Sequence, residues 1–275
     1  MIATRPIPAS GEALPILGFG TWQTFDTGPA EQDRAPRREV LRLLFEAGGR
    51  VIDSSPMYGR AEAVVGDLLT QMKARDKAFL ATKVWTTGEQ AGIAQMQASS
   101  ARLQSQTIDL MQIHNLVDWK TQLKTMRAWK EQGRFRYLGI THYTTGALDE
   151  LADILGREPL DFVQMGYSIG GTEAERRLLP VARERGVAVI VNQPFESGTL
   201  FARVKGKPLP AFAAELDCSS WGQFFLKFIL GHPAVTCVIP GTERPDHAAD
   251  NIKAGIGRQP DQAERQRMRA AWQSI

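Results

Sequence analysis

Cysteine and long apolar runs are both scarce in this chain of 275 residues. Its two cysteines, Cys218 and Cys237, have no paired spacing, which argues against a disulfide framework and against a cysteine metal motif. No stretch approaches the roughly 18 consecutive apolar residues of a membrane helix. The first residues after Met1 also lack the apolar run of a secretory signal. We therefore expect a cytoplasmic protein with two buried free thiols and no membrane contact.

The chain also lacks an excess of one charge. Its 33 basic and 30 acidic residues leave a net charge of +3, and Lys and Arg are scattered among the acids. A nucleic-acid partner is therefore not expected. The four histidines have no metal-ligand spacing, and no serine sits in a nucleophile turn, so we expect neither a metal site nor acyl transfer.

What the chain does have is an alternation of short apolar runs and amphipathic stretches, which favours parallel strands joined by crossover helices. A hairpin is expected around Ser10-Gly11. The expected strands are Leu14–Gly20, Arg50–Asp53, Phe79–Lys83, Ile108–His114, Arg136–Thr141, Phe162–Gly166, Ala188–Asn192 and Val235–Ile239. The first expected helix opens at Pro36 and ends at Gly48-Gly49. The other expected helices are 62–71, 90–103, 121–131, 146–155, 173–185, 219–230, 245–256 and 262–272.

Eight strand–helix units in about 250 residues is the size of a closed (β/α)8 barrel. The competing α/β architecture, an open doubly wound sheet, usually carries a Gly-x-Gly-x-x-Gly turn after its first strand. Here that strand runs into Gly18-Phe19-Gly20-Thr21-Trp22, which lacks the spacing. We expect one barrel domain over residues 1–275, with an N-terminal hairpin and an extra C-terminal helix.

Polar residues lie where several of these strands end. Asp53, Lys83 and His114 each end an expected strand, and Tyr58 follows in the loop after Asp53. In a barrel, the loops after the strands build the site, so these four side chains are expected to converge. A nearby ammonium is expected to lower the pKa of a tyrosine and make it a better proton donor. Lys83 can supply that charge, Asp53 can orient Lys83, and His114 can direct a carbonyl oxygen. The set can protonate a carbonyl, and hydride or base must then come from a bound cofactor.

On these residues the chain resembles the aldo-keto reductase superfamily over essentially its whole length. Five segments match in order: Gly18–Trp22, Asp53–Gly59, Thr82-Lys83, Gln112–His114 and Ile239–Thr242. The resemblance implies a barrel that binds NADP(H) across its strand ends. It also implies catalytic roles for Asp53, Tyr58, Lys83 and His114, with Tyr58 as the general acid. The cofactor-binding residues that it implies are Gly20, Thr21, Trp22, Asp53, Thr141, His142, Gln164, Asn192, Gln193, Pro194, Phe195, Ser197, Gly241, Thr242, Arg244, His247 and Asn251.

The chain departs from the family pattern at several cofactor positions. His142 stands where the family has the Asn of its Ser-Asn pair. Asn192 stands where an aromatic residue commonly stacks on nicotinamide, so either that stack is lost or Tyr167 or Phe195 supplies it. Gly241 stands where NADPH-preferring members often carry Lys, and Arg244 is expected to hold the 2′-phosphate instead. NADPH is favoured, and NADH stays open.

The substrate is less well defined by the sequence. Trp22, Tyr58, Trp85 and His114 are expected to line an apolar substrate pocket. The resulting hypothesis is NADPH-dependent reduction of an aldehyde or ketone by a monomer or weak homo-oligomer. Two alternatives stay open: a cofactor-sensing protein on the same fold with little turnover, and NAD-dependent alcohol oxidation.

Overall fold

Eight parallel strands form the centre of the molecule in the computed structural model, which describes all 275 residues. They pair in chain order from first to last, and single bridges from Leu17 to Val238 and from Gly20 to Gly241 join the two ends of the sheet. The predicted (β/α)8 barrel is confirmed. Its strands are β3 (Phe19–Gly20), β4 (Val51–Asp53), β5 (Phe79–Val84), β6 (Ile108–His114), β7 (Phe135–His142), β8 (Phe162–Gly166), β9 (Ala188–Asn192) and β10 (Cys237–Val238).

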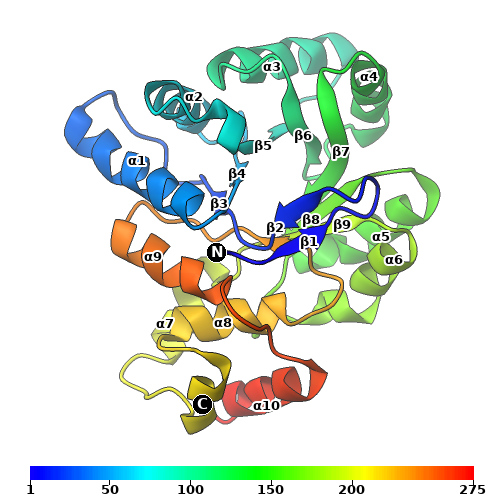
Figure 1. The fold of residues 1–275 in the computed structure, drawn as a ribbon. Coiled ribbons are helices and arrows are strands. Elements are labelled where there is room, and N and C mark those ends of the chain that lie inside the picture. Colours follow the sequence, from blue (N-terminus) through cyan, green and yellow to red (C-terminus); the bar gives the residue numbers. More distant parts are fainter.

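Helices surround this sheet, as Figure 1 shows. Those that follow the strands turn an apolar face inward, as in α5, where all five buried residues are Leu, Ile or Ala. A short helix and a C-terminal helix, α7 and α10, are additional to the repeat. The helices are α1 (Glu31–Glu46), α2 (Ala61–Gln71), α3 (Glu89–Arg102), α4 (Trp119–Glu131), α5 (Leu148–Arg157), α6 (Leu178–Glu184), α7 (Thr199–Arg203), α8 (Trp221–Leu230), α9 (Pro245–Ala254) and α10 (Gln262–Gln273).

The predicted first strand, Leu14–Gly20, is wrong in extent, because its residues serve two sheets. Its start belongs to β2 (Ala13–Pro15), which pairs antiparallel with β1 (Thr4–Pro6) in the predicted hairpin, and only β3 joins the barrel. The hairpin lies across the middle of the ring of helices in Figure 1. An apolar run predicts burial but not the neighbour with which each residue pairs.

Most predicted helices lie within two residues of their observed bounds, and two differ by more. The helix expected to open at Pro36 begins at Glu31, because the carbonyl of Ala30 already accepts the N–H groups of Asp33 and Arg34. The helix expected over 173–185 is divided into a 3-10 turn and α6, because Arg177 has non-helical backbone angles.

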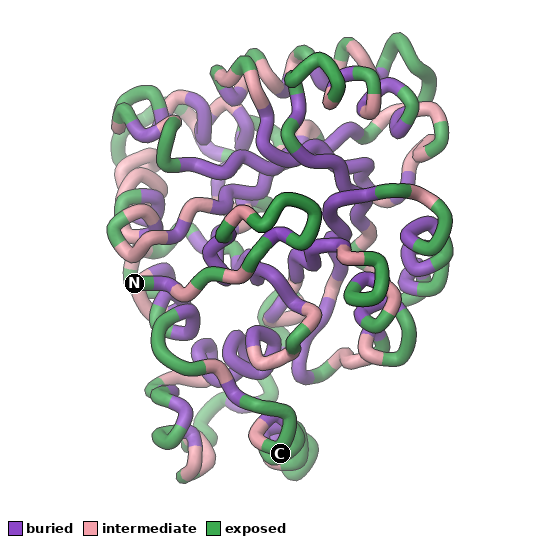
Figure 2. Tube along the Cα trace, turned by 45° about the vertical axis from the view of Figure 1, so that its right-hand side comes forward, coloured by how far each residue is buried: buried purple, intermediate pink, exposed green.

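The core has two parts, one inside the barrel and one between the barrel and its helices. The inner part is small, and it includes Ile7 and Leu14 of the hairpin together with Phe79 and Phe162 of the strands. The outer part is larger and packs the helices onto the sheet. Figure 2 shows the resulting pattern, with buried segments in the middle and exposed ones at the periphery. The hairpin therefore closes one end of the barrel, the end at which the strands begin.

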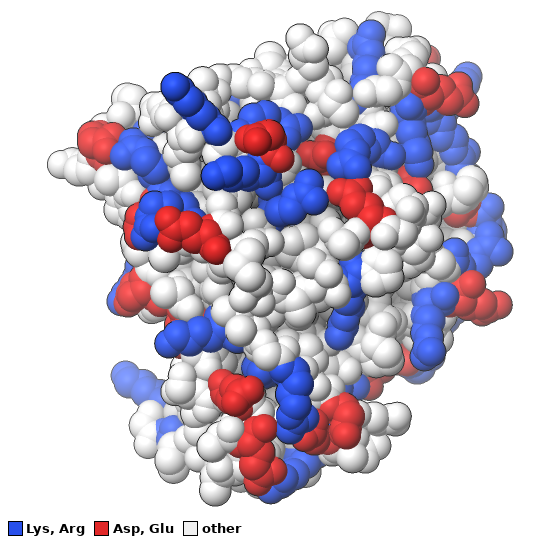
Figure 3. Space-filling model, viewed as in Figure 1, with Lys and Arg blue, Asp and Glu red and all other residues white.

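Acidic and basic side chains alternate on the surface. In Figure 3 they lie side by side on the face shown and form no stripe of one sign. Many of them are paired, as Arg42 is with Glu39. No helix is both long enough and apolar enough to cross a membrane.

Candidate active site

Four polar side chains gather at the open end of the barrel. Asp53 ends β4 and His114 ends β6, while Lys83 lies one residue before the end of β5. All strands run in the same direction, so these ends lie on one face. Tyr58 reaches the same place from the loop after β4, with its ring centroid 5.7 Å from that of His114. The structure therefore brings the predicted set together.

Asp53 and Lys83 form a fully buried ion pair. Lys83 Nζ lies 2.6 Å from Asp53 Oδ2 and donates a second hydrogen bond to the carbonyl of Ser54 at 2.7 Å. Burial is the largest single influence and acts to lower the pKa of Lys83, but Asp53 and Tyr58 together outweigh it and raise that pKa above its ordinary value. Lys83 is therefore an ammonium, and these two contacts use two of its three N–H groups.

Two amide side chains hold the other carboxylate oxygen. Asp53 Oδ1 accepts hydrogen bonds from Gln164 at 2.8 Å and from Gln112 at 3.2 Å. Gln164 Oε1 in turn accepts from Asn192 Nδ2 at 3.1 Å. Asp53 is therefore held by side chains from three other strands, β5, β6 and β8, and its Oδ2 accepts from Lys83.

Tyr58 is a protonated phenol at neutral pH. Its side chain lies beside Lys83, whose Nζ is 5.1 Å from the ring centroid. Burial raises the pKa of Tyr58, and the charge of Lys83 offsets only part of that effect. Lys83 acts to lower the pKa of Tyr58, as expected, but the net shift of that pKa is upward because desolvation of the phenolate is the larger effect.

His114 is buried and neutral. Burial, followed by the charge of Lys83, lowers the pKa of His114 to about 2. Its Nδ1 lies 3.0 Å from the hydroxyl of Ser55. A histidine with this pKa carries no extra proton near neutral pH, so it cannot serve as the acid.

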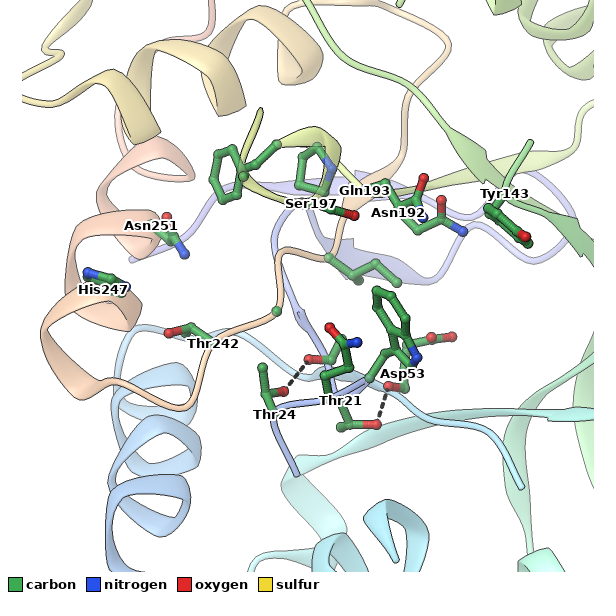
Figure 4. Close-up of a pocket in the computed structure, with 18 of the residues that line it drawn as sticks. Thr21, Thr24, Asp53, Tyr143, Asn192, Gln193, Ser197, Thr242, His247 and Asn251 are labelled. Atoms are coloured by element: carbon green, nitrogen blue, oxygen red, sulfur yellow. Dashed lines mark hydrogen bonds between the residues drawn. The ribbon is translucent and has the colours of Figure 1, made fainter. Parts of the chain in front are cut away.

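A cavity of about 970 Å³ opens over these residues. In Figure 4 it extends from Tyr143, which follows β7, past Asp53 to His247 and Asn251 on α9. Its size is at the upper end of ordinary small-molecule sites. Of the predicted site residues, those that line it are Gly20, Thr21, Trp22, Asp53, Tyr58, His114, Thr141, Gln164, Asn192, Gln193, Pro194, Phe195, Ser197, Gly241, Thr242, His247 and Asn251.

Four predicted site residues do not line this cavity. Lys83 lies beneath it, fully buried against Asp53. Trp85 is 41% exposed and lies outside the lining, and so does His142, whose Nδ1 accepts hydrogen bonds from the backbone N–H and hydroxyl of Thr144. Arg244 points elsewhere and pairs through two nitrogens with Asp246. No lysine or arginine lines the cavity.

The aromatic residues near Asn192 differ in their availability to a ligand. Tyr167 is 2% exposed and bonds Glu175 and Arg265, so it does not reach the cavity. Phe195 lines the cavity, with its ring packed on Phe201 at 4.8 Å. Of the two residues expected to replace the missing aromatic residue, Phe195 alone lines the cavity.

Sequence reasoning missed twelve residues of the lining. Asn115 and Tyr143 directly follow strands, so the strand-end rule could have found them. The residues contributed by α7 and α8 have no such signal, since packing alone brings those helices to the cavity. The missed residues are Gln23, Thr24, Met57, Asn115, Tyr143, Gly198, Phe201, Ser220, Trp221, Gly222, Ile239 and Asp250.

The lining suits an elongated polar ligand such as a nicotinamide dinucleotide. Asn192 Oδ1 is buried without a hydrogen-bond partner, so it is free to accept from a ligand amide. At the far end, Thr242 and Asn251 line the cavity beside the N-terminal turn of α9, where backbone N–H groups favour anions. No cluster of side chains could hold a metal ion.

Comparison with known proteins gives a consistent family. The model of the Aldo/keto reductase family matches residues 16–273. Methylglyoxal reductase YeaE of Escherichia coli is 29% identical over 85% of this chain and 84% of its own length. The holo form of an aldo-keto reductase from Bacillus halodurans has a TM-score of 0.77 and 25% identity, covering 99% of this chain and 96% of that one. An aldo-keto reductase from Klebsiella pneumoniae, solved with NADPH, has a TM-score of 0.80 at 23% identity, covering 99% and 95%.

Proposed function

The chain belongs to the aldo/keto reductase family of NAD(P)H-dependent oxidoreductases, and from that premise we propose that it reduces small aldehydes or ketones to alcohols, with Tyr58 as the proton donor. The observation that carries this proposal is the position of a protonated tyrosine, backed by a buried lysine–aspartate pair, at the wall of a large cavity. The reduced nicotinamide, when bound, supplies a hydride to the carbonyl carbon.

The acid follows from a comparison of the titratable groups at the cavity. His114 is neutral because its pKa is lowered to about 2, so it has no acidic proton to give near neutral pH. Tyr58 keeps its proton because burial raises its pKa. When Tyr58 gives up that proton, the ammonium of Lys83 faces the phenolate and stabilises it. The residue that can donate is therefore Tyr58, and Lys83 makes the donation less costly.

The positions of the remaining groups support binding of the carbonyl group beside Tyr58. The rings of Tyr58 and His114 meet edge to face, at an interplanar angle of 83°, and both line the cavity. A carbonyl oxygen between them can contact both side chains. Trp22 and Met57 are exposed at this part of the lining and give it an apolar wall.

Both NADPH and NADH are proposed as cofactors. Asn192, Gln164 and Thr141 lie where the strand ends face the cavity, and they supply amide and hydroxyl groups for a nicotinamide carboxamide. Arg244 remains the proposed contact for a 2′-phosphate, which it reaches only by leaving Asp246.

The test is oxidation of NADPH and NADH by the purified protein with a panel of aldehydes, ketones and dicarbonyls. Methylglyoxal is the first compound to try, since one relative is named as a methylglyoxal reductase. We expect turnover with at least one member of the panel. Tight cofactor binding without turnover on any of them would instead identify a sensor.

A further inference from the structure

Ser55 is a fully buried serine that the resemblance leaves without a role. It lies in the loop between Asp53 and Tyr58, and its hydroxyl is 3.0 Å from His114 Nδ1. The only other hydrogen bond of this hydroxyl comes from the backbone N–H of Met57, which donates to it at 3.3 Å. The side chain therefore connects the loop that carries Tyr58 to the imidazole of His114.

These two contacts fix where the hydroxyl proton goes. The oxygen of Ser55 already accepts from Met57, and its own hydrogen needs an acceptor because the side chain is buried. Nδ1 of His114 is the one acceptor within reach. If Nδ1 carried a hydrogen, it would donate to the second lone pair of the Ser55 oxygen. The hydroxyl hydrogen would then have no acceptor, which is costly in a buried site. The hydroxyl therefore donates to Nδ1.

The tautomer of His114 follows. A neutral imidazole has one N–H, so a bare Nδ1 places the hydrogen on Nε2. Nε2 makes no hydrogen bond within the protein, yet it is not a buried atom. It is therefore accessible from the cavity that His114 lines. The cavity thus has two hydrogen-bond donors close together, Nε2–H of His114 and the phenol of Tyr58.

We propose that Ser55 is a positioning residue, which holds His114 in the Nε2–H tautomer so that the imidazole donates to the substrate oxygen beside Tyr58. The proposal rests on the proposed reduction of a carbonyl, because that oxygen receives both donors. Without Ser55, Nδ1 has no partner to keep it bare, and part of the population moves its hydrogen to Nδ1. Nε2 then becomes an acceptor and repels the carbonyl oxygen.

The first test is nitrogen NMR of the cofactor-free protein labelled with 15N-histidine. The chain has four histidines, so His114→Gln assigns the signals of His114. We expect Nε2 protonated and Nδ1 bare in the native protein, and a shift of both signals toward a mixture in Ser55→Ala. Ser54→Ala is the matched control, because the Ser54 hydroxyl contacts Thr21 and not His114, and it should leave these signals in place. A protonated Nδ1 in the native protein, or unchanged signals in Ser55→Ala, overturns the proposal.

The second test is kinetic. Loss of one oriented hydrogen bond in Ser55→Ala should lower kcat by roughly 3- to 30-fold, with KM and the Kd for NADPH changed less than twofold. A shifted tautomer with unchanged kcat overturns the role of Ser55 in the reaction. Absence of carbonyl reduction in the native protein would count against the proposed function alone, since the NMR result needs no turnover.

Discussion

The two ends of the barrel contain similar polar residues, but these residues differ in whether they bond within the chain or face a cavity. At the closed end, Tyr137 bonds Ser10 at 2.7 Å and Glu12 at 2.8 Å, and Arg136 pairs with Asp109 at 2.8 Å. At the open end, Tyr58 and His114 line the cavity, and a buried lysine and aspartate lie beneath them.

The difference shows which polar groups serve structure and which are left for a ligand. Every group just named at the closed end has its partner within the chain, so the network closes on itself and fixes the hairpin over the barrel. At the open end, Asp53 and Lys83 are paired, but the donors that they support face the cavity. Donors that face the cavity are available to a ligand. Variants at the two ends should therefore affect different properties.

Lys83→Met should have the largest effect. It leaves the carboxylate of Asp53 buried without a counter-charge, which should lower the free energy of unfolding by about 3–5 kcal/mol and remove turnover. Arg136→Met at the closed end should cost about 1 kcal/mol or less, because that side chain is 39% exposed. Urea unfolding measures both.

A double variant separates charge from catalysis. Asp53→Asn combined with Lys83→Met removes both charges and should recover most of the lost stability without recovering turnover. If Lys83→Met lowered the free energy of unfolding no more than Arg136→Met does, the proposed difference between the two ends would be wrong.

The tyrosine pair should separate activity from stability. Tyr58→Phe should lower kcat by at least about 100-fold, the scale of general acid catalysis, with NADPH binding nearly unchanged. Tyr137→Phe should leave kcat within about twofold and lower the free energy of unfolding by roughly 1–2 kcal/mol, because its hydrogen bonds to Ser10 and Glu12 are lost. Steady-state kinetics and urea unfolding of both proteins test this. More than a third of native turnover in folded Tyr58→Phe would rule out Tyr58 as the acid.

The pH dependence of stability should report the neutral His114. Because the pKa of His114 is lowered to about 2, the unfolded chain binds its proton below about pH 6.5 while the folded protein does not. Stability contributed by His114 is therefore complete above that pH and decreases as the pH falls toward the folded pKa. Between pH 7 and 5, the native protein should lose about 1–2 kcal/mol more than His114→Gln. Parallel unfolding curves for the two proteins over this range would contradict a buried neutral His114.

Substitution of Arg244 should have the smallest effect. Like the polar groups of the closed end, Arg244 already has a partner within the chain, and a phosphate must displace that partner, Asp246. A charge-assisted contact to the 2′-phosphate is offset in part by loss of the exposed Arg244–Asp246 pair. Arg244→Ala should therefore weaken NADPH binding roughly 5- to 30-fold and NADH binding hardly at all. Asp246→Asn, which frees Arg244, should tighten NADPH a few-fold. Fluorescence titration with both cofactors measures this. Equal affinities of the native protein for NADPH and NADH would show that Arg244 holds no phosphate.

The sequence by itself determined the barrel and the position of the four residues along it. Local patterns suffice for this, since short apolar runs predict the strands and the residue at which each run ends is fixed by its place in the chain. Asp53 and His114 are the last residues of their strands, and Lys83 is one residue from the end of its own. Parallel strands then carry these ends to one face whatever the details of packing.

Only the tertiary structure decided the properties that depend on burial, on packing and on a choice between competing partners. The pKa of Tyr58 is raised because segments far apart in the chain bury it, and no local pattern measures that desolvation. Arg244 lies outside the cavity because it reaches the nearby Asp246, a choice between partners that spacing does not make. The residues of α7 and α8 line the cavity because those helices pack beside it. Position in the chain determines which residues lie at the open end. Burial and competing contacts determine the charge state of their side chains and where those side chains point.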